Sequence, residues 1–563
     1  MSVITDKYRQ WMYKADMDLE LKAELSVMSP EQINDAFYTD VEFGTAGMRG
    51  LLGAGTNRLN VYTVRKATLG LAQYLNSISS KPSVAIAFDN RHNSLKFAQE
   101  SAKVLAANGI ESYVFETLRS TPELSYAVRY LKCTSGIMIT ASHNPKEYNG
   151  YKVYDSTGCQ MIPEMVAHVI DNIQALGDSF VDSPELSQAQ QALIHSIGED
   201  VDEPYLKEVE GIQLNPELNK DNFKVVFTPQ HGTSIVSLRP LFSRLGYDVT
   251  YVEEQCSADE NFSNTIIPNP EDPRAYELAI EYAKKVDADI AISTDPDGDR
   301  LGVVVKQNGE YVLMTGNQTG AVLLEYVFTQ MIKKNLMPVH PVMFNTVVTS
   351  DLGEKVAHNY GVETEKTLTG FKYIGDKIHK YEQTHEKDFV FGYEESYGYL
   401  VQPFVRDKDA NQSTILICEA ANYYLQQGLT LMDGLEQLYE KYGTYDESQQ
   451  SISLPGEEGK KKIQQMLSNL RENIPSQIAG VNVVKYEDYK SAKQYVGDQV
   501  FDIVGFDRSD VLKYFLEDET WIAIRPSGTE PKCKIYYCIR GENKADVEQK
   551  KEKYYAAMSE LTK

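Results

Sequence analysis

The sharpest chemical signal in the sequence is a set of three aspartates at alternate positions. Asp295, Asp297 and Asp299 follow a short apolar stretch and are separated only by Pro and Gly. Three carboxylates at this spacing can converge on one hard cation, and Pro and Gly supply the bend that this requires. An EF-hand loop is excluded, because its sixth and twelfth positions would be Arg300 and Lys306 instead of Gly and Glu. A solvated acidic turn is the alternative, but the preceding strand favours a metal site.

A second chemical signal is a serine that follows another apolar strand. Ser142 and His143 lie in the sequence Thr-Ala-Ser-His-Asn-Pro, and Lys152 comes shortly after. A serine hydroxyl is a poor nucleophile unless a base, a cation or a metal lowers the cost of its alkoxide. Taken alone, this motif is equally compatible with a turn or a helix cap. It lacks the Gly-x-Ser-x-Gly elbow, which disfavours an α/β-hydrolase triad.

A third candidate site lies near the C-terminus, after the apolar strand predicted at 521–524. Arg525, Ser527, Gly528 and Thr529 combine one guanidinium, two hydroxyls and a flexible backbone. These groups suit a phosphate monoester, since Arg grips two oxygens at once and a Gly amide can approach closely. A hairpin turn with an incidental Arg is the alternative.

The fourth candidate site combines carboxylates with a hydroxyl at another strand end. Glu394 and Ser396 follow the apolar strand predicted at 389–391. Each carboxylate can accept hydrogen bonds from two neighbouring sugar hydroxyls, so this pattern is typical of a sugar site. By itself the signal is weak, because an exposed Glu pair is usually solvated surface.

Composition limits the class of protein. The chain has 563 residues, with 56 basic and 81 acidic side chains and a formal net charge of −25. We therefore expect several domains and no nucleic-acid partner, since phosphate-backbone binders concentrate Lys and Arg. Neither a secretory signal nor an apolar run long enough to cross a bilayer is present, so we expect a cytoplasmic protein without a membrane partner. The six cysteines lack paired metal spacing and are expected to be reduced.

The elements that must position these residues follow one plan, in which a short apolar strand leads into a polar loop and then a helical pattern. The plan recurs at 84–88, 136–139, 223–227, 289–292 and 342–344. It predicts an α/β fold with mixed or parallel sheets covered on both faces. Ligands in such sheets bind beyond the strand ends, where the candidate residues stand.

Changes in composition predict four domains. Helical spacing in the first forty residues indicates one or two surface helices. The acidic, Pro-containing stretch 198–204 reads as a linker, an apolar helix is expected at 321–332, and a Lys- and Glu-rich segment opens the last unit. The predicted domains are 1–205 with the serine loop, 206–316 with the aspartates, 317–445 with the sugar site and 446–563 with the phosphate site.

The four motifs, taken together, resemble those of the α-D-phosphohexomutase superfamily in order and spacing. They are Ser-His-Asn-Pro, Asp-x-Asp-x-Asp-Arg, Gly-x-Glu-x-Ser and Arg-Pro-Ser-Gly-Thr-Glu-Pro, and the opening Phe43 to Gly50 resembles a first-domain signature of that family. The resemblance covers about residues 40 to 563. The N-terminal extension, the segment 369–372 and the segment 406–409 are most similar to the phosphoglucomutase and phosphopentomutase branch.

The resemblance implies a four-domain architecture, with three related α/β domains of mixed sheets and a smaller C-terminal α+β domain around a central cleft. It implies that Ser142 becomes a phosphoserine and that it holds Mg²⁺ together with the three aspartates. The resemblance also implies that Glu394 and Ser396 recognise the sugar, with Thr369 and Gly370 also contacting substrate. The phosphate that is not reacting would be bound by Arg525, Ser527, Gly528 and Thr529.

Residues around the transferring phosphoryl group are implied in the same way. They are Arg49, His143, Lys152, Arg300 and Lys408, of which Lys152 or Lys408 would handle the proton. The sequence departs from the family at Gly398, since many members carry His two residues after the Ser of the sugar loop. The general acid or base is therefore left open.

The reaction implied is the interconversion of α-D-glucose 1-phosphate and glucose 6-phosphate by a monomer or homodimer. Phosphoserine and a sugar 1,6-bisphosphate, which also serves as activator, are the expected intermediates. Pentose or mannose phosphates are alternative substrates. Two alternative functions are a metal-dependent sugar phosphatase and a non-catalytic sugar-phosphate binding protein. Release of inorganic phosphate would identify the phosphatase, and detection of a phosphoserine would count against the binding protein.

Overall fold

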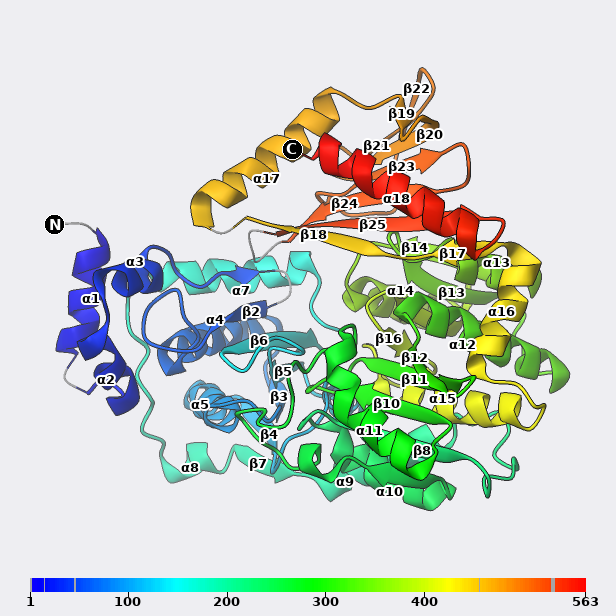
Figure 1. Ribbon diagram of the computed structural model, residues 1–563. Helices are drawn as coiled ribbons and strands as arrows, with labels where there is room; N and C mark the ends of the chain where they lie inside the picture. Colours follow the sequence, from blue (N-terminus) through cyan, green and yellow to red (C-terminus); the bar gives the residue numbers. More distant parts are fainter. Residues whose placement is uncertain (1–2, 15, 45–46, 455, 528–531, 563) are drawn as a thin grey trace. The chain divides into compact units, whose positions relative to one another are not determined.

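The computed structural model describes residues 3–14, 16–44, 47–454, 456–527 and 532–562 (Figure 1). The chain divides into two compact units. The first consists of Met1–Met314 and Phe371–Gln427, and the second of Thr315–Gly370 and Gly428–Lys563. All six cysteines are free, as predicted. Among the helices in the described ranges, none combines the length and apolar character that a bilayer span requires.

The first unit opens with a seven-stranded mixed sheet in the order β1-β2-β6-β5-β3-β4-β7. Strands β3, β4, β5 and β7 are parallel, whereas β1, β2 and β6 join by antiparallel pairing. The apolar runs predicted at 84–88 and 136–139 form β3 and β5, both buried on two faces. The strands are β1 (Phe43–Gly44), β2 (Gly47–Leu51), β3 (Ser83–Phe88), β4 (Glu111–Phe115), β5 (Ser135–Ile139), β6 (Tyr148–Asp155) and β7 (Ile194–Ile197).

Helices connect these strands, and polar side chains cap the starts of α4, α6 and α8. Asn60 accepts hydrogen bonds from the first turn of α4, and Ser120 accepts one from the first turn of α6. Helices α5 and α7 both pack on α4 (Figure 1). The helices are α4 (Val61–Ile78), α5 (Ser94–Ala107), α6 (Thr121–Tyr130), α7 (Pro163–Ala175), α8 (Gln188–Gln191) and α9 (Glu199–Glu210).

Three helices precede this sheet, α1 (Val3–Tyr13), α2 (Leu19–Val27) and α3 (Pro30–Phe37). The expectation of one or two surface helices is wrong in number, but their surface character is confirmed, since Tyr13, Leu19 and Val27 are 84%, 83% and 80% exposed. Trp11 and Leu25 are 5% and 0% exposed and belong to the core cluster of the seven-stranded sheet. Trp11 packs on Tyr62 of α4, so the extension buries a narrow apolar stripe and leaves its other faces exposed.

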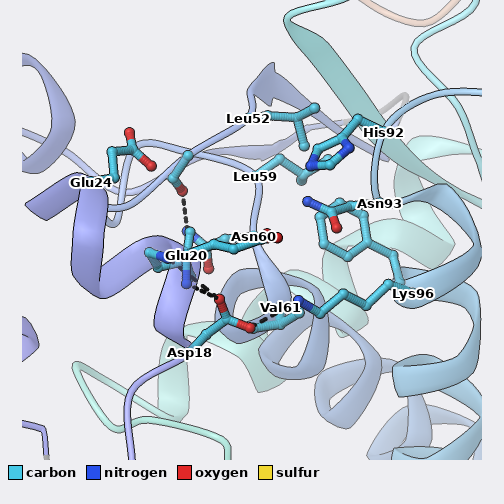
Figure 2. A pocket seen from close by; sticks show the side chains of 13 residues that line it. Asp18, Glu20, Glu24, Leu52, Leu59, Asn60, Val61, His92, Asn93 and Lys96 are labelled. Atoms are coloured by element: carbon cyan, nitrogen blue, oxygen red, sulfur yellow. Dashed lines mark hydrogen bonds and ion pairs between the residues drawn. The ribbon is translucent and has the colours of Figure 1, made fainter. Parts of the chain in front are cut away.

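Polar contacts also attach this extension, as Figure 2 shows. Asp18 caps α2 and accepts a 2.8 Å bond from the ammonium of Lys96 on α5. The first turns of α2, α4 and α5 line a cavity of about 300 Å³ here. The charged side chains Asp18 and Lys96 in its wall pair with each other, and the Glu24 carboxylate accepts from the Ala54 amide.

The segment predicted to be an acidic linker is a helix. Residues 199–204 form the first half of α9, which buries Val201, Tyr205 and Val209. Its acidic residues lie in the first turn, where they favour the helix N-terminus, and this offsets the hydrogen bond lost at Pro204. The boundary at 205 itself stays a prediction.

A second mixed sheet of the first unit has the order β12-β11-β10-β8-β9. Its parallel strands are β8 (Lys224–Thr228), β9 (Asp248–Tyr251) and β10 (Ile290–Thr294), and β11 (Leu301–Gln307) and β12 (Glu310–Leu313) add as antiparallel strands. Helices α10 (Ser234–Leu245) and α11 (Glu277–Val286) and the 3-10 helices η1 (Glu253–Gln255) and η2 (Pro273–Tyr276) connect them. The unit ends with α14 (Phe371–Thr384), the antiparallel pair β15 (Asp388–Glu394) and β16 (Gly398–Leu400), and α15 (Ala410–Leu425).

The second unit begins with α12 (Gly316–Lys333), which confirms the apolar helix expected at 321–332. Parallel strands β13 (Pro341–Thr346) and β14 (Glu363–Thr367) flank α13 (Asp351–Asn359), and α16 (Leu431–Tyr442) follows. A nine-stranded antiparallel sheet and helices α17 (Gly456–Glu472) and α18 (Lys544–Leu561) enclose the C-terminal core. The strands are β17 (Thr444–Asp446), β18 (Gln449–Ser453), β19 (Gln477–Ile478), β20 (Val481–Asp488), β21 (Lys493–Val496), β22 (Gln499–Asp502), β23 (Leu512–Leu516), β24 (Trp521–Pro526) and β25 (Lys532–Gly541).

Candidate active site

The three aspartates form a buried loop directly after β10. Asp295, Asp297 and Asp299 are 0%, 0% and 2% exposed. Oδ1 of Asp295 accepts hydrogen bonds from the backbone amides of Asp299 at 3.1 Å and Arg300 at 3.0 Å, which curls the loop around the carboxylate. Gly298 has a φ of 68°, and a Cβ there would lie 2.7 Å from the hydroxyl of another residue. Glycine is therefore required at this turn.

The loop fits a divalent cation. One oxygen of each aspartate lies within 4.8 Å of the other two. Oδ1 of Asp297 and Oδ1 of Asp299 are buried, and neither has a hydrogen-bond partner among the described residues. Burial, followed by the charges of the other two carboxylates, raises the pKa of Asp295. A hard cation with oxygen ligands would satisfy these atoms and remove the repulsion among them.

Ser142 lies against this loop. Its hydroxyl donates a 2.8 Å hydrogen bond to Oδ2 of Asp295, and Nδ1 of His143 is 3.2 Å from the same hydroxyl oxygen. The backbone of Ser142 is left-handed, with a φ of 52°, and its amide donates to the hydroxyl of Thr140 at 2.8 Å. Strained backbone of this kind is tolerated where the surroundings fix a functional side chain.

The serine loop is held by a buried cation, Arg91, which sequence reasoning did not identify as a site residue. Arg91 is 3% exposed and forms an ion pair of 3.1 Å with Asp89, both in the loop after β3. Its guanidinium donates to the carbonyl oxygens of Ser142 at 2.5 Å, Asn144 at 2.6 Å, Pro145 at 2.8 Å and Tyr148 at 3.1 Å. One side chain therefore fixes the whole loop, and the only signal for it was an Asp-Asn-Arg run after an apolar strand.

Two lysines contact the aspartate loop. Nζ of Lys152 lies 2.8 Å from Oδ2 of Asp297 and 3.8 Å from Oδ2 of Asp299. Nζ of Lys408 lies 3.1 Å from Oδ2 of Asp299 and 3.3 Å from Asp407. Burial alone would lower the pKa of Lys408, but the charges of Asp299 and Asp407 outweigh it and raise the pKa. Lys408 is therefore a fixed positive charge at neutral pH.

Two arginines complete the positive side of the site. Arg300 forms a 2.6 Å ion pair with Glu271, and its Nε lies 3.9 Å from Oδ1 of Asp299. Arg49, on β2, donates to the side-chain oxygen of Asn144 at 3.1 Å, within the serine loop. Burial lowers the pKa of Arg49, and Asp297 opposes that effect. The predicted residues Arg49, Ser142, His143, Lys152, Arg300, Lys408 and the aspartates thus meet in the first unit.

The predicted sugar residues adjoin this cluster. Glu394 ends β15, is 6% exposed and interacts electrostatically with Arg300 and Lys408. Ser396 lies in the turn between β15 and β16. The carbonyl of Tyr397 in this turn accepts a 2.9 Å bond from the amide of Leu301, immediately after Arg300. The sugar loop and the aspartate loop are therefore joined by a backbone hydrogen bond.

Comparison with known proteins identifies the family to which the chain belongs. Four models of phosphoglucomutase/phosphomannomutase match it, alpha/beta/alpha domain I at residues 40–179, domain II at 203–309, domain III at 315–442 and the C-terminal domain at 467–552. The phosphoglucomutase of Staphylococcus aureus (strain MSSA476) is 40% identical over 543 residues, 96% of this chain and 97% of that protein. That of Staphylococcus epidermidis (strain RP62A) is 40% identical over 514 residues, 90% of this chain and 92% of that protein.

The chain belongs to the phosphoglucomutase/phosphomannomutase family, within the α-D-phosphohexomutase superfamily. It is an enzyme of the mutase class. Solved structures agree in fold. A putative phosphomannomutase from Thermus thermophilus has a TM-score of 0.69 at 19% identity, covering 93% of this chain and 99% of its own. Parafusin, a Paramecium phosphoglucomutase, has a TM-score of 0.67 at 17% identity, covering 93% and 95%.

Family membership confirms the predicted fold class, three α/β domains with mixed sheets and a C-terminal domain. The four domain boundaries and the central cleft stay predictions. Thr369 and Gly370, which follow β14, belong to the second unit, as do Arg525 and Ser527. The amide of Ser527 donates to the carbonyl of Lys532 at 2.7 Å. Gly528 and Thr529 lie outside the described residues.

Proposed function

We propose that the chain interconverts α-D-glucose 1-phosphate and glucose 6-phosphate through a phosphorylated Ser142 and a sugar 1,6-bisphosphate. The observation that carries this proposal is the 2.8 Å hydrogen bond between the Ser142 hydroxyl and Asp295, in a buried loop of three carboxylates. A reactive hydroxyl beside a cation site is the arrangement that phosphoryl transfer needs. The 40% identity to phosphoglucomutases over nearly the whole chain supports glucose phosphate as the substrate.

The reaction consists of two phosphoryl transfers. In the first, the bond between phosphorus and Oγ of Ser142 breaks, and phosphorus bonds to the free hydroxyl oxygen of the sugar phosphate. The sugar hydroxyl loses its proton and Oγ gains one. After the bisphosphate turns over, its other phosphoryl group returns to Oγ, and the two proton movements are reversed. The product leaves with one phosphate, so that no inorganic phosphate is released.

The fixed charges around Ser142 suit this chemistry. Nδ1 of His143, 3.2 Å from Oγ of Ser142, is the group placed to hold a proton at that atom. The ammonium of Lys152 and the guanidinium of Arg300 form ion pairs within the site and would lie near the oxygens on which negative charge develops. The low exposure of Ser142, 3%, limits the access of water to a phosphoserine.

Asp295, Asp297 and Asp299 would hold Mg²⁺, together with Ser142. When bound, Mg²⁺ supplies positive charge that stabilises the transferring phosphoryl oxygens. The replacement Asp297→Asn is expected to weaken Mg²⁺ binding in calorimetry and to remove most of the activity. The exposed Asp287, whose replacement Asp287→Asn removes a surface carboxylate, is the control. Equal Mg²⁺ affinity in both variants would contradict the metal assignment.

Three groups of residues are proposed to recognise the substrate. We propose that Glu394 and Ser396 bind the sugar hydroxyls, that Thr369 and Gly370 contribute to substrate binding, and that the 525–529 segment binds the phosphate that is not reacting. A guanidinium that grips two phosphate oxygens should set the affinity for substrate. Arg525→Ala is therefore expected to raise KM strongly with a smaller effect on kcat, and an unchanged KM would remove this role.

The decisive experiment follows Ser142. Intact-mass analysis of the purified protein is expected to show one added phosphoryl group, which Ser142→Ala removes together with the conversion of glucose 1-phosphate. Ser156, exposed on the turn after β6, provides the control variant Ser156→Ala. Full turnover by Ser142→Ala would overturn the phosphoserine scheme, and stoichiometric phosphate release would instead favour a sugar phosphatase. Rates on glucose 1-phosphate, mannose 1-phosphate and ribose 1-phosphate then decide the sugar.

A further inference from the structure

Gly398, the first residue of β16, stands where any side chain would collide with Lys408. A Cβ built on Gly398 would lie 2.0 Å from Cδ of Lys408, 2.8 Å from its Cγ and 3.1 Å from its Cε. Gly398 is not among the glycines with a left-handed φ, so the backbone conformation does not require glycine. The aliphatic part of Lys408 therefore occupies the space that a side chain at position 398 would need.

The path of Lys408 is fixed at both ends. Its backbone amide donates to Oδ1 of Asp407 at 2.8 Å, and its ammonium reaches Oδ2 of Asp299 at 3.1 Å. The amide of Asp409 donates to the carbonyl of Tyr399 at 2.8 Å, which ties this segment to β16. Between these two ends the side chain of Lys408 passes directly beside Gly398 on β16.

The hairpin register places this crossing at the sugar site. Gly398 is the antiparallel partner of Glu394, and side chains of paired residues stand on the same face of a sheet. A side chain at position 398 would therefore stand beside Glu394. In this chain that place is taken by the stem of Lys408.

We propose that Gly398 is a positioning residue, whose missing side chain leaves the passage through which Lys408 brings its ammonium to Asp299. Position 398 thereby decides whether the aspartate loop carries a second lysine. Lys152 approaches Asp299 only to 3.8 Å, so Lys408 is the nearer cation at that carboxylate. The assignment deepens the proposed function, because it accounts for how one positive charge is kept at the phosphoryl-transfer site.

The test is a double-mutant cycle between the two positions. Gly398→Ala places a methyl group on Cδ of Lys408 and should drive that side chain away, whereas Lys408→Ala removes the atoms that would collide. We expect each single variant to lose about tenfold or more in kcat/KM, and Gly398→Ala/Lys408→Ala to be no worse than Lys408→Ala, since coupled neighbours are not additive. The proposal would be overturned if the double variant lost activity by the product of the two single losses, or if Gly398→Ala were fully active.

A second measurement does not depend on turnover. An ammonium at Asp299 competes with a bound cation, so both single variants should bind Mn²⁺ roughly three- to tenfold more tightly than the wild type in calorimetry. The double variant should match Lys408→Ala. General damage to the site would weaken Mn²⁺ binding in Gly398→Ala, and that result would refute the proposal.

One control variant and the wild-type activity separate the possible failures. Gly211 ends α9 with a φ of −74°, and a Cβ there would make only ordinary contact, 3.4 Å from the nearest atom. Gly211→Ala should leave kcat/KM and Mn²⁺ affinity unchanged. If the wild type does not interconvert sugar phosphates, the proposed function fails, while the Mn²⁺ cycle still decides whether Gly398 positions Lys408.

Discussion

Thr121 makes two hydrogen bonds to Asp297, one from its hydroxyl to Oδ2 at 3.0 Å and one from its backbone amide to the carbonyl oxygen at 2.8 Å. It is the first residue of α6, and the cap formed by Ser120 fixes the start of that helix. Oδ2 of Asp297 also accepts from Lys152, so the other oxygen, Oδ1, remains directed to the cation site. A helix of the first domain thus orients a carboxylate of the second.

Thr121→Val should therefore weaken metal binding without removing any ligand. The variant keeps the shape of the side chain and the backbone bond but loses the hydroxyl. Partners that orient metal ligands typically change metal affinity by about 10- to 100-fold when removed, and we expect the lower end because Lys152 remains. Calorimetric titration with Mg²⁺ measures the effect. Thr121→Ser, which keeps the hydroxyl, should bind as the wild type does, and equal weakening of both variants would contradict the argument.

Arg91 supports the serine loop, and its removal should be costly to stability. Arg91→Met leaves the buried carboxylate of Asp89 without its ion-pair partner, which should lower the free energy of unfolding by about 3–5 kcal/mol. Urea denaturation measures the loss. Asp89→Asn/Arg91→Met removes both charges and should recover part of it, whereas a further loss in the double variant would mean that the ion pair is not the cause.

Asp409 should make stability depend on pH between about 4 and 6. It is fully buried, and burial, only partly opposed by hydrogen bonds from the backbone amide of Gln412 and the hydroxyl of Tyr205, raises its pKa to about 6. The unfolded value is about 3.9, so in this window the folded state binds more protons and its stability falls as pH rises. About two pKa units correspond to a cost of about 3 kcal/mol at neutral pH.

The variant Asp409→Asn tests this sign. Asn is an equally good cap for α15 and carries no charge, so the variant should gain stability relative to the wild type as pH rises from 4 to 7. Unfolding free energies of both proteins across this range provide the comparison. Parallel pH profiles would show that the pKa of Asp409 does not change on folding.

The sequence predicts the strands and the loop motifs because each depends on local pattern. Fully apolar runs such as 84–88 and 136–139 form buried strands, and the polar residues after them, Ser142 among them, reach the candidate site. Arg91 and Thr121 escape such a reading because their partners lie far along the chain. For Thr121 the separation from Asp297 is 176 residues. Only the packing of the second sheet beside the first brings Thr121 and Asp297 together.

The same limit explains why the acidic stretch is misassigned. The acidic stretch at 198–204 resembles a linker, but Tyr205 and Val209 bury one face of α9 and make it a helix despite Pro204. The N-terminal helices are surface helices, as their pattern predicts, and only their number, three, differs from the expectation. Trp11 and Leu25 are buried by contacts with residues beyond the extension.

Trp11 should anchor the N-terminal extension to the first domain. Its ring packs edge-to-face on Phe37 at 5.7 Å and on Tyr62 of α4 at 5.5 Å between centroids. Trp11→Ala would leave a cavity between the extension and α4 and should cost about 3–5 kcal/mol of unfolding free energy. Tyr13, on the same helix but 84% exposed, gives the matched control Tyr13→Ala, which should change stability by less than about 0.5 kcal/mol. Equal urea midpoints for the two variants would mean that the extension adds nothing to the stability of the domain beneath it.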